Sequence, residues 1–179
     1  MDPVVADANR RFEFSKSLLN RAKTAYDVEL EKSFSEMAVA AAFSCLEGML
    51  THIFDHFIDS RNFDIFERSI MQEKSVKLVR GQPYLGEQRF QSIDDRVQFL
   101  FWKFSGEEFD KSKSWWPNFA NAVSIRNGIM HPKKEAEITA QDAERAILAI
   151  VAALDELMWT VFGSRWPKAN KGIVPSYAI

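Results

Sequence analysis

Apolar residues recur at steps of three and four along almost the whole 179-residue chain, and this spacing constrains the fold more than any other feature. It places apolar side chains on one face of an α-helix, whereas a half-buried β-strand needs strict alternation, which is almost absent here. Glycines follow several of these segments and can end the helices. The sequence therefore predicts an all-α fold, an up-and-down bundle of five or six helices.

One segment, residues 33–58, is predicted to be the central helix. Two apolar lines run along it at helical spacing, so it can bury two of its sides. A narrow polar stripe lies between the lines, and polar groups on a mostly buried helix need partners. The first line is Phe34, Met37, Ala41, Cys45, Met49 and Ile53, the second is Phe43, Leu46, Leu50, Phe54 and Phe57, and the stripe is Ser44, Glu47, Thr51 and Asp55.

The same spacing divides the rest of the chain into five further helical segments. Asn62, Ser92 and Thr139 are suited to cap the helices that follow them, and Gly106 and Gly163 are suited to end helices. We expect a single domain over residues 1–179, with a loop at about 81–91 and an irregular tail at 164–179. The further helices are expected at about residues 7–30, 62–80, 92–105, 115–131 and 139–162.

Charge and cysteine content limit the ligands and the cellular compartment that fit the chain. The formal net charge is −2, so a nucleic-acid contact would have to come from a local basic patch. Cys45 is the only cysteine, which excludes an internal disulfide, and its apolar surroundings favour a core position over a nucleophile. The start of the chain lacks the features of a signal peptide, and the longest apolar run, 147–162, is too short to span a membrane. We therefore expect a cytoplasmic protein with no membrane segment.

The run from Arg126 to Pro132 contains the residues with the clearest chemical character. Arg126 falls near the middle of an apolar arc of its helix, where a guanidinium needs an anion because a buried unpaired charge loses its hydration. Asn127 and His131 are four apart and share one flank of the helix. Pro132 disfavours helical geometry at His131, so the helix is expected to end there, among carbonyl groups that favour a protonated ring.

The polar stripe of the central helix offers the anion that Arg126 requires. Glu47 is the first choice and Asp55 the second. A purely architectural interpretation is also open, in which Arg126 ties two helices together and His131 is a surface residue without a task.

The pattern Arg-Asn-x-x-x-His, formed by Arg126, Asn127 and His131 at the end of an apolar helix, resembles the motif of the HEPN superfamily. The resemblance covers loosely residues 34–162, with one long helix before the motif and another after it. It implies a metal-independent endoribonuclease of toxin or defence type, with its site in a cleft between two protomers. In that interpretation His131 is the acid or base, Arg126 stabilises the phosphate, and Asn127 is the polar residue of the motif.

The resemblance also sets the expected partners and the alternatives. It implies a homodimer, RNA as substrate and an antitoxin protein as a candidate partner, with no cofactor. Several family members carry a Tyr shortly after the His, where this chain has Pro132 and Lys133, so a role that depends on that Tyr is absent. Since HEPN domains without cleavage activity exist, a non-catalytic helical dimer that acts as an interaction or regulatory module is the competing hypothesis.

Two further groups of residues are weaker candidates. Lys133 and Lys134 follow the motif and could contact RNA phosphates, although two lysines in a loop are commonplace. His52 and His56 are one helical turn apart, a spacing that metal sites use. Because no third His or Cys cluster lies nearby, hydrogen bonding or a surface position is the favoured interpretation and no metal site is expected.

Overall fold

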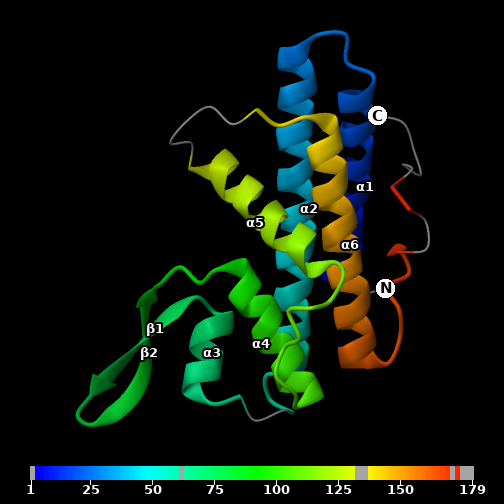
Figure 1. Cartoon of the computed structure of the whole chain (residues 1–179). Coiled ribbons are helices and arrows are strands. Elements are labelled where there is room, and N and C mark those ends of the chain that lie inside the picture. The colour runs from blue at the N-terminus through cyan, green and yellow to red at the C-terminus, as the bar shows by residue number, and fades with distance from the viewer. Residues whose placement is uncertain (1–2, 61–62, 132–136, 170–171, 174–179) are drawn as a thin grey trace.

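The computed structural model describes residues 3–60, 63–131, 137–169 and 172–173. The described chain is mostly helical, but the prediction of an all-α fold is corrected by a small antiparallel sheet of two strands (Figure 1). The elements in order are α1 (Pro3–Lys23), α2 (Val28–Phe57), α3 (Ile65–Met71), β1 (Lys74–Val79), β2 (Gln82–Gln88), α4 (Ile93–Ser105), α5 (Trp116–Met130) and α6 (Ala140–Phe162).

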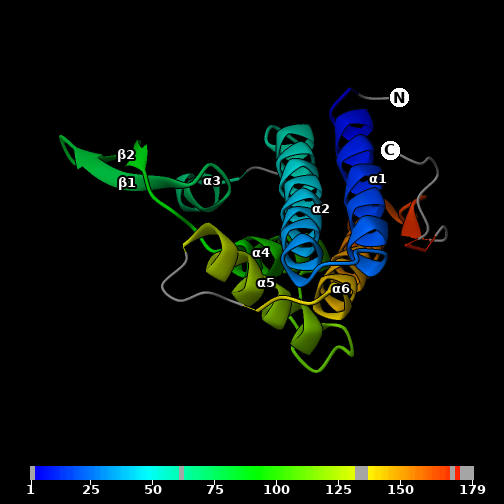
Figure 2. The same cartoon turned by 90° about the horizontal axis from the view of Figure 1, so that it is seen from above.

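Helix α2 is the central element, as its two apolar lines predict. It contacts α1, α4, α5 and α6, which confirms that it packs on both the motif helix and the final helix. Figures 1 and 2 show α1, α2 and α6 side by side, with α6 running in the same direction as α2 and α1 in the opposite direction. Helix α2 is long and apolar enough to cross a membrane by length and composition, but most of its apolar residues are buried within the fold.

Local capping explains where the helices begin and end. The Thr139 hydroxyl accepts from the Asp142 amide and the Asp142 carboxylate accepts from the Thr139 amide, which forms a capping box at the start of α6. Gly163 ends α6 with a left-handed φ of 65°. Ser92 and Gly106 have the same roles for α4. The predicted bounds of these two helices are confirmed.

The first predicted helix, 7–30, is wrong at its C-terminal end. The side chain of Asp27 accepts hydrogen bonds from the amides of Glu29 and Leu30, and it caps a new helix. Helix α1 therefore ends at Lys23, and α2 begins at Val28.

The predicted third helix, 62–80, is also wrong. Helix α3 is only Ile65–Met71, and Asp64 caps it; Asn62 lies outside the described residues. A hairpin follows, in which Val79 pairs with Gln82 across a two-residue turn. The predicted loop at about 81–91 is therefore wrong over Gln82–Gln88, which form β2. Arg80 and Gly81 both have positive φ, 52° and 80°, which is the geometry of the hairpin turn that matches the twist of the strands.

The hairpin and α3 project from the side of the helical body (Figures 1 and 2). Residues of the distal half of the hairpin are exposed, including Leu78 at 75% and Tyr84 at 50%. The hairpin therefore lies outside the core, which is built by the helices.

Tryptophans contribute to the core at two separate places. Trp116 is buried and packs on Phe119, while Trp115 is half-buried and donates its indole N–H to Glu156, so both tryptophans pack with the core. In the irregular tail, Trp166 is 1% exposed and its ring centroid lies 4.9 Å from that of Phe12. This tail contact with α1 was not predicted from the sequence.

Candidate functional site

Arg126 lies in the half of α5 that extends beyond the core. The buried residues of α5, which are Trp116, Phe119, Ala122 and Val123, all belong to its first half. Residues 124–130 are half-buried or exposed. Figure 1 shows this end of the helix pointing away from α2 and α6. The apolar arc on which Arg126 was placed is therefore buried only along part of its length.

Arg126 pairs with Glu47, the residue predicted as the first choice for its anion. Arg126 Nη2 donates to Glu47 Oε1 at 2.8 Å, and the two side chains are 17% and 38% exposed. The pair thus sits at the edge of the core, with the guanidinium more enclosed than the carboxylate. Asp55, the second choice, lies two turns further along α2 and lines a different cavity from Arg126.

Asn127 provides a second anchor for the same guanidinium. Its Oδ1 accepts from Arg126 Nη1 at 3.2 Å, so the two terminal nitrogens of Arg126 are held by different acceptors. Because the guanidinium is planar, two contacts on its two terminal nitrogens restrict its orientation. Asn127 thus helps to orient Arg126, its neighbour in the motif. The spacing of the two residues in the sequence does not by itself indicate this contact.

His131 is the residue that caps the C-terminus of α5, as its position before Pro132 predicts. Its backbone N–H donates to the carbonyl of Asn127 at 3.0 Å, and its φ of −135° and ψ of 67° leave the helical region. The residue is exposed. Pro132, Lys133 and Lys134 lie outside the described residues, so the contribution of the two lysines stays a prediction.

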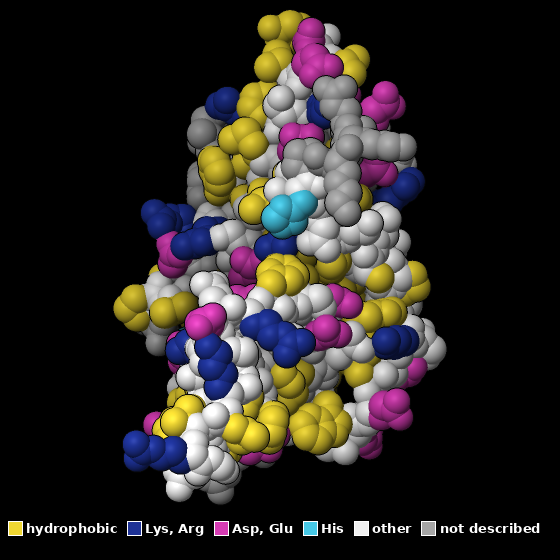
Figure 3. Space-filling model, turned by 90° about the vertical axis from the view of Figure 1, so that its left-hand side faces the viewer, with side chains coloured by type: hydrophobic (Ala, Val, Ile, Leu, Met, Phe, Trp, Pro, Cys, Tyr) yellow, Lys and Arg dark blue, Asp and Glu magenta, His cyan; other side chains and the backbone are white. Residues whose placement is uncertain are grey.

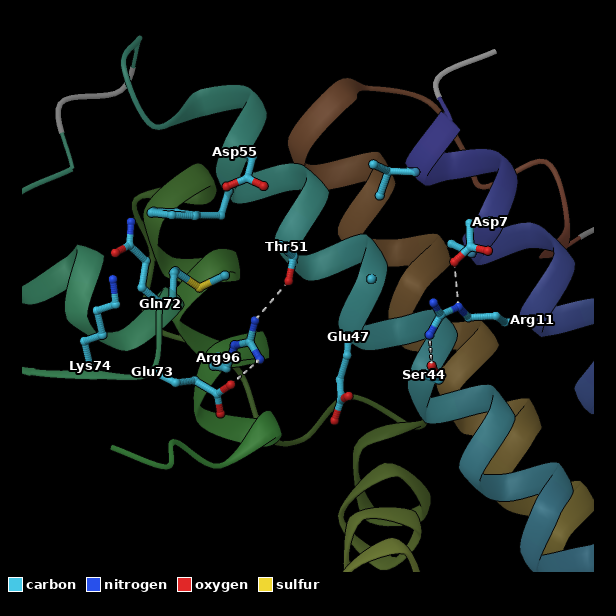
Figure 4. Close-up of a pocket in the computed structure, with 15 residues that line it drawn as sticks. Asp7, Arg11, Ser44, Glu47, Thr51, Asp55, Gln72, Glu73, Lys74 and Arg96 are labelled. Atoms are coloured by element: carbon cyan, nitrogen blue, oxygen red, sulfur yellow. Dashed lines mark hydrogen bonds and ion pairs between the residues drawn. The ribbon is translucent and has the colours of Figure 1, made fainter. Parts of the chain in front are cut away.

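Two cavities adjoin the Arg126–Glu47 pair. The smaller, of about 310 Å³, lies between α2, α4, α5 and the end of the hairpin and is lined by Glu47, Glu73, Gln88, Phe90, Gln91, Ile93, Arg96 and Arg126. The larger, of about 700 Å³, opens between α1, α2 and the start of β1 (Figure 4). Glu47, Glu73 and Arg96 line both cavities.

Arg96 and Glu73 are site residues that the sequence interpretation missed. Arg96 is 6% exposed, and its guanidinium points toward Thr51 and Glu73 in Figure 4. A signal for Arg96 was present, because it stands four positions before the apolar Leu100 on the buried side of α4. Glu73 gave no such signal, since it fell within the helix predicted at 62–80, whereas the helix observed there ends at Met71.

The alternative chemical groups of the chain lie away from this arrangement. Burial raises the pKa of the Cys45 thiol to about 12, which confirms that this residue belongs to the core. The rings of His52 and His56 have centroids 6.2 Å apart. Among the described residues, no group of three or more His, Cys, Asp or Glu side chains is placed to hold a metal ion.

The motif residues are thus brought together as one local unit: Glu47 and Asn127 hold Arg126 on a cavity wall, and His131 follows one turn later at an exposed helix end. Comparison of the chain with family models, with curated proteins and with solved structures finds no match.

Proposed function

We propose that the protein is a metal-independent endoribonuclease of the HEPN toxin or defence type, which cleaves RNA at a site shared by two protomers. The observation that supports this most is the anchoring of Arg126. Its guanidinium is held by Glu47 and Asn127 at the wall of a cavity, one helical turn before an exposed histidine. A cation fixed in place beside a group that can transfer protons near neutral pH is what RNA cleavage without a metal requires.

The reaction in this proposal is an internal transfer within the RNA. One imidazole takes the proton of a 2′-hydroxyl, the oxygen attacks the adjacent phosphorus, and the bond to the 5′-oxygen breaks. A second imidazole, in the protonated form, gives its proton to the leaving 5′-oxygen. Arg126 donates to the phosphate oxygens while negative charge accumulates on them, and its fixed position avoids a reorganisation cost at that moment.

A homodimer supplies the two imidazoles that one chain lacks at its motif. A two-fold axis brings the same surface of each protomer together, so a His131 near the axis would meet its copy. Exposed apolar side chains on α5 and α2, the helices that the Arg126–Glu47 pair joins, support such an interface, with Met130 54% and Met37 48% exposed and Ile129 half-buried. Figure 3 shows apolar side chains beside the histidine that this face presents, with charged side chains of both signs elsewhere on the same face.

The remaining expectations belong to the same proposal. We infer that α1, α4, α5 and α6 form one bundle around α2, of the kind that the resemblance implies, and that the protein acts in the cytoplasm, where its substrate is RNA. An antitoxin that covers the motif is the protein partner that a toxin of this class requires.

The exposed apolar face favours a second candidate as well. A non-catalytic helical dimer that serves as an interaction module would present the same surface, with the Arg126–Glu47 pair kept for its architecture. The two candidates differ in whether His131 affects RNA.

The test is cleavage of a single-stranded RNA in the presence of EDTA by the wild type, by His131→Ala and by the control His56→Ala. His56 is also an exposed histidine, at the end of α2. We expect His131→Ala to lose roughly 100-fold or more in rate, the range of a general acid or base, while His56→Ala keeps the wild-type rate. Equal rates for the wild type and His131→Ala would refute the enzyme and leave the interaction module.

A further inference from the structure

Arg96 is a buried cation whose N–H groups make few and long contacts. Its side chain is 7% exposed, and its Nε has no hydrogen-bond partner among the described residues. Its two other contacts are long: Nη2 lies 3.5 Å from Thr51 Oγ1, and Nη1 lies 3.8 Å from Glu73 Oε2. A guanidinium carries five donor hydrogens, and a buried charge is costly unless it is well paired. Arg96 therefore has donor capacity for an anion that this arrangement leaves unused.

The position of Arg96 gives such an anion a place to bind. Arg96 shares the smaller cavity with Arg126, and Gln88 and Gln91, whose side chains carry amides, line it too. Both arginines and both amides can donate to oxygen atoms. The cavity, of about 310 Å³, is large enough for a phosphate group with part of a nucleotide.

Two carboxylates also line this cavity, but they are not equivalent. Glu47 accepts a hydrogen bond from Arg126 at 2.8 Å and is engaged there. Glu73 is only at ion-pair distance from Arg96, 3.8 Å, and its side chain is 30% exposed. Its backbone is held firmly, because its carbonyl accepts from the Arg89 amide at 2.7 Å. The Glu73 carboxylate can thus turn toward solvent without disturbing the hairpin.

We propose that this cavity is a phosphate-binding site, in which Arg96 binds two phosphate oxygens and Glu73 is an internal carboxylate that the phosphate displaces. A phosphate matches the planar guanidinium with two parallel hydrogen bonds, which the single distant carboxylate does not make. Burial lowers the pKa of Arg96, and Glu73 and Glu47 oppose this shift. The guanidinium stays charged at neutral pH in either case.

The surroundings favour a nucleotide phosphate in an RNA strand over a free phosphate. Phe90 lines the same cavity and is 65% exposed, so its ring is available to stack on a base. Arg126, the residue assigned to the reacting phosphate, lines this cavity as well. The RNA source therefore rests on the proposed function, whereas the phosphate chemistry of Arg96 does not.

The experiment measures binding without cleavage. The first probe is inorganic phosphate, whose binding is measured by the rise in melting temperature. The second is a 2′-O-methyl oligoribonucleotide, which lacks the hydroxyl needed for cleavage and whose binding is measured by fluorescence anisotropy. The variants are Glu73→Gln, Arg96→Lys and the control Glu87→Gln. Glu87 is an exposed hairpin glutamate that pairs with Lys77, so this control removes the same charge outside the two cavities.

We expect Glu73→Gln to bind the oligonucleotide about fivefold more tightly, because a competing charge is removed, and Glu87→Gln to leave binding unchanged. Arg96→Lys is expected to bind about tenfold more weakly, because an ammonium cannot make the two parallel bonds. A gain with inorganic phosphate alone, and none with the oligonucleotide, would assign the site to a free phosphorylated ligand.

A purely structural Arg96–Glu73 pair predicts the opposite result. Glu73→Gln would then lower the melting temperature and leave both affinities unchanged or weaker, which would overturn the proposal, as would an equal gain from Glu87→Gln. Because neither probe is cleaved, tighter binding by Glu73→Gln in a protein that cuts no RNA would refute the proposed activity and keep this site.

Discussion

At the scale of single residues, the two arginines of the site show what a sequence can and cannot reveal. Arg126 stands on an apolar arc of its helix, so the sequence predicts that it needs an anion. The polar stripe of α2 predicts Glu47 as that anion, and Glu47 is the partner observed, at 2.8 Å. Arg96 has a comparable apolar setting on α4, but its neighbours Thr51 and Glu73 come from α2 and from the link between α3 and β1. A contact across three elements is fixed by packing and is not encoded in any local spacing.

The Arg126–Glu47 pair leads to the first prediction at this scale. Glu47→Gln should lower the free energy of unfolding by about 1.5 kcal/mol, the value of a hydrogen bond to a charged group, because Arg126 then keeps only a neutral acceptor. The larger cost of breaking a fully buried pair is not expected, since Glu47 is 38% exposed. Urea denaturation measures the change, with Glu36→Gln as a control on the same helix but outside the two cavities. Equal stability of both variants would show that the pair contributes nothing to folding.

Cys45 gives a prediction about reactivity. Burial raises its pKa from 9.0 to about 12, so the thiol is protonated in the native state at pH 8 and also inaccessible. A thiol reagent should label the folded protein at pH 8 only as fast as it unfolds, and label the protein in urea at once. Since the folded pKa is the higher one, ionisation of the unfolded thiol should reduce stability as pH rises above 9.0. Rapid labelling of the folded protein would contradict the buried position.

At the scale of elements, the predicted helices agree with the structure where they are amphipathic and capped. The prediction is wrong where contacts with the rest of the fold determine whether a segment forms a helix or a strand. Helix α6 has a continuous apolar stripe, a capping box and a terminal glycine, so three signals agree on its bounds. The hairpin is short, charged and exposed, so its alternation is weak, and its formation depends on the Arg80–Gly81 turn. The helix expected in its place has apolar residues at helical spacing too, and the sequence alone could not decide between them.

The capping box of α6 gives the prediction at this scale. Thr139→Ala should lower the free energy of unfolding by about 1 kcal/mol, because the amide of Asp142 loses its acceptor. The bond to Thr139 also lowers the pKa of Asp142, so the contribution is present above the ordinary value of 3.8 and is lost as pH falls through the folded pKa. Denaturation at pH 7 and at pH 3 measures this, with Thr160→Ala as the control in the same helix. An equal loss for the two variants would show that the cap has no particular role.

At the scale of the whole molecule, the protein is a helical body that carries one charged site at its edge. The long helices α1, α2 and α6 bury their apolar faces against one another. The second half of α5 extends past this body and carries the motif with it (Figure 1). A helix end that is exposed in one protomer, and partly apolar, is available to a second copy. We propose that this second copy completes the site.

Subunit mixing tests this claim most directly. Wild-type and His131→Ala chains, refolded together in equal amounts, should pair at random, so that about a quarter of the dimers contain two wild-type chains. If cleavage needs both imidazoles, the rate in EDTA should fall to about a quarter of that of the same total amount of wild type. A rate of about one half would contradict the account, because each chain would then carry a complete site of its own.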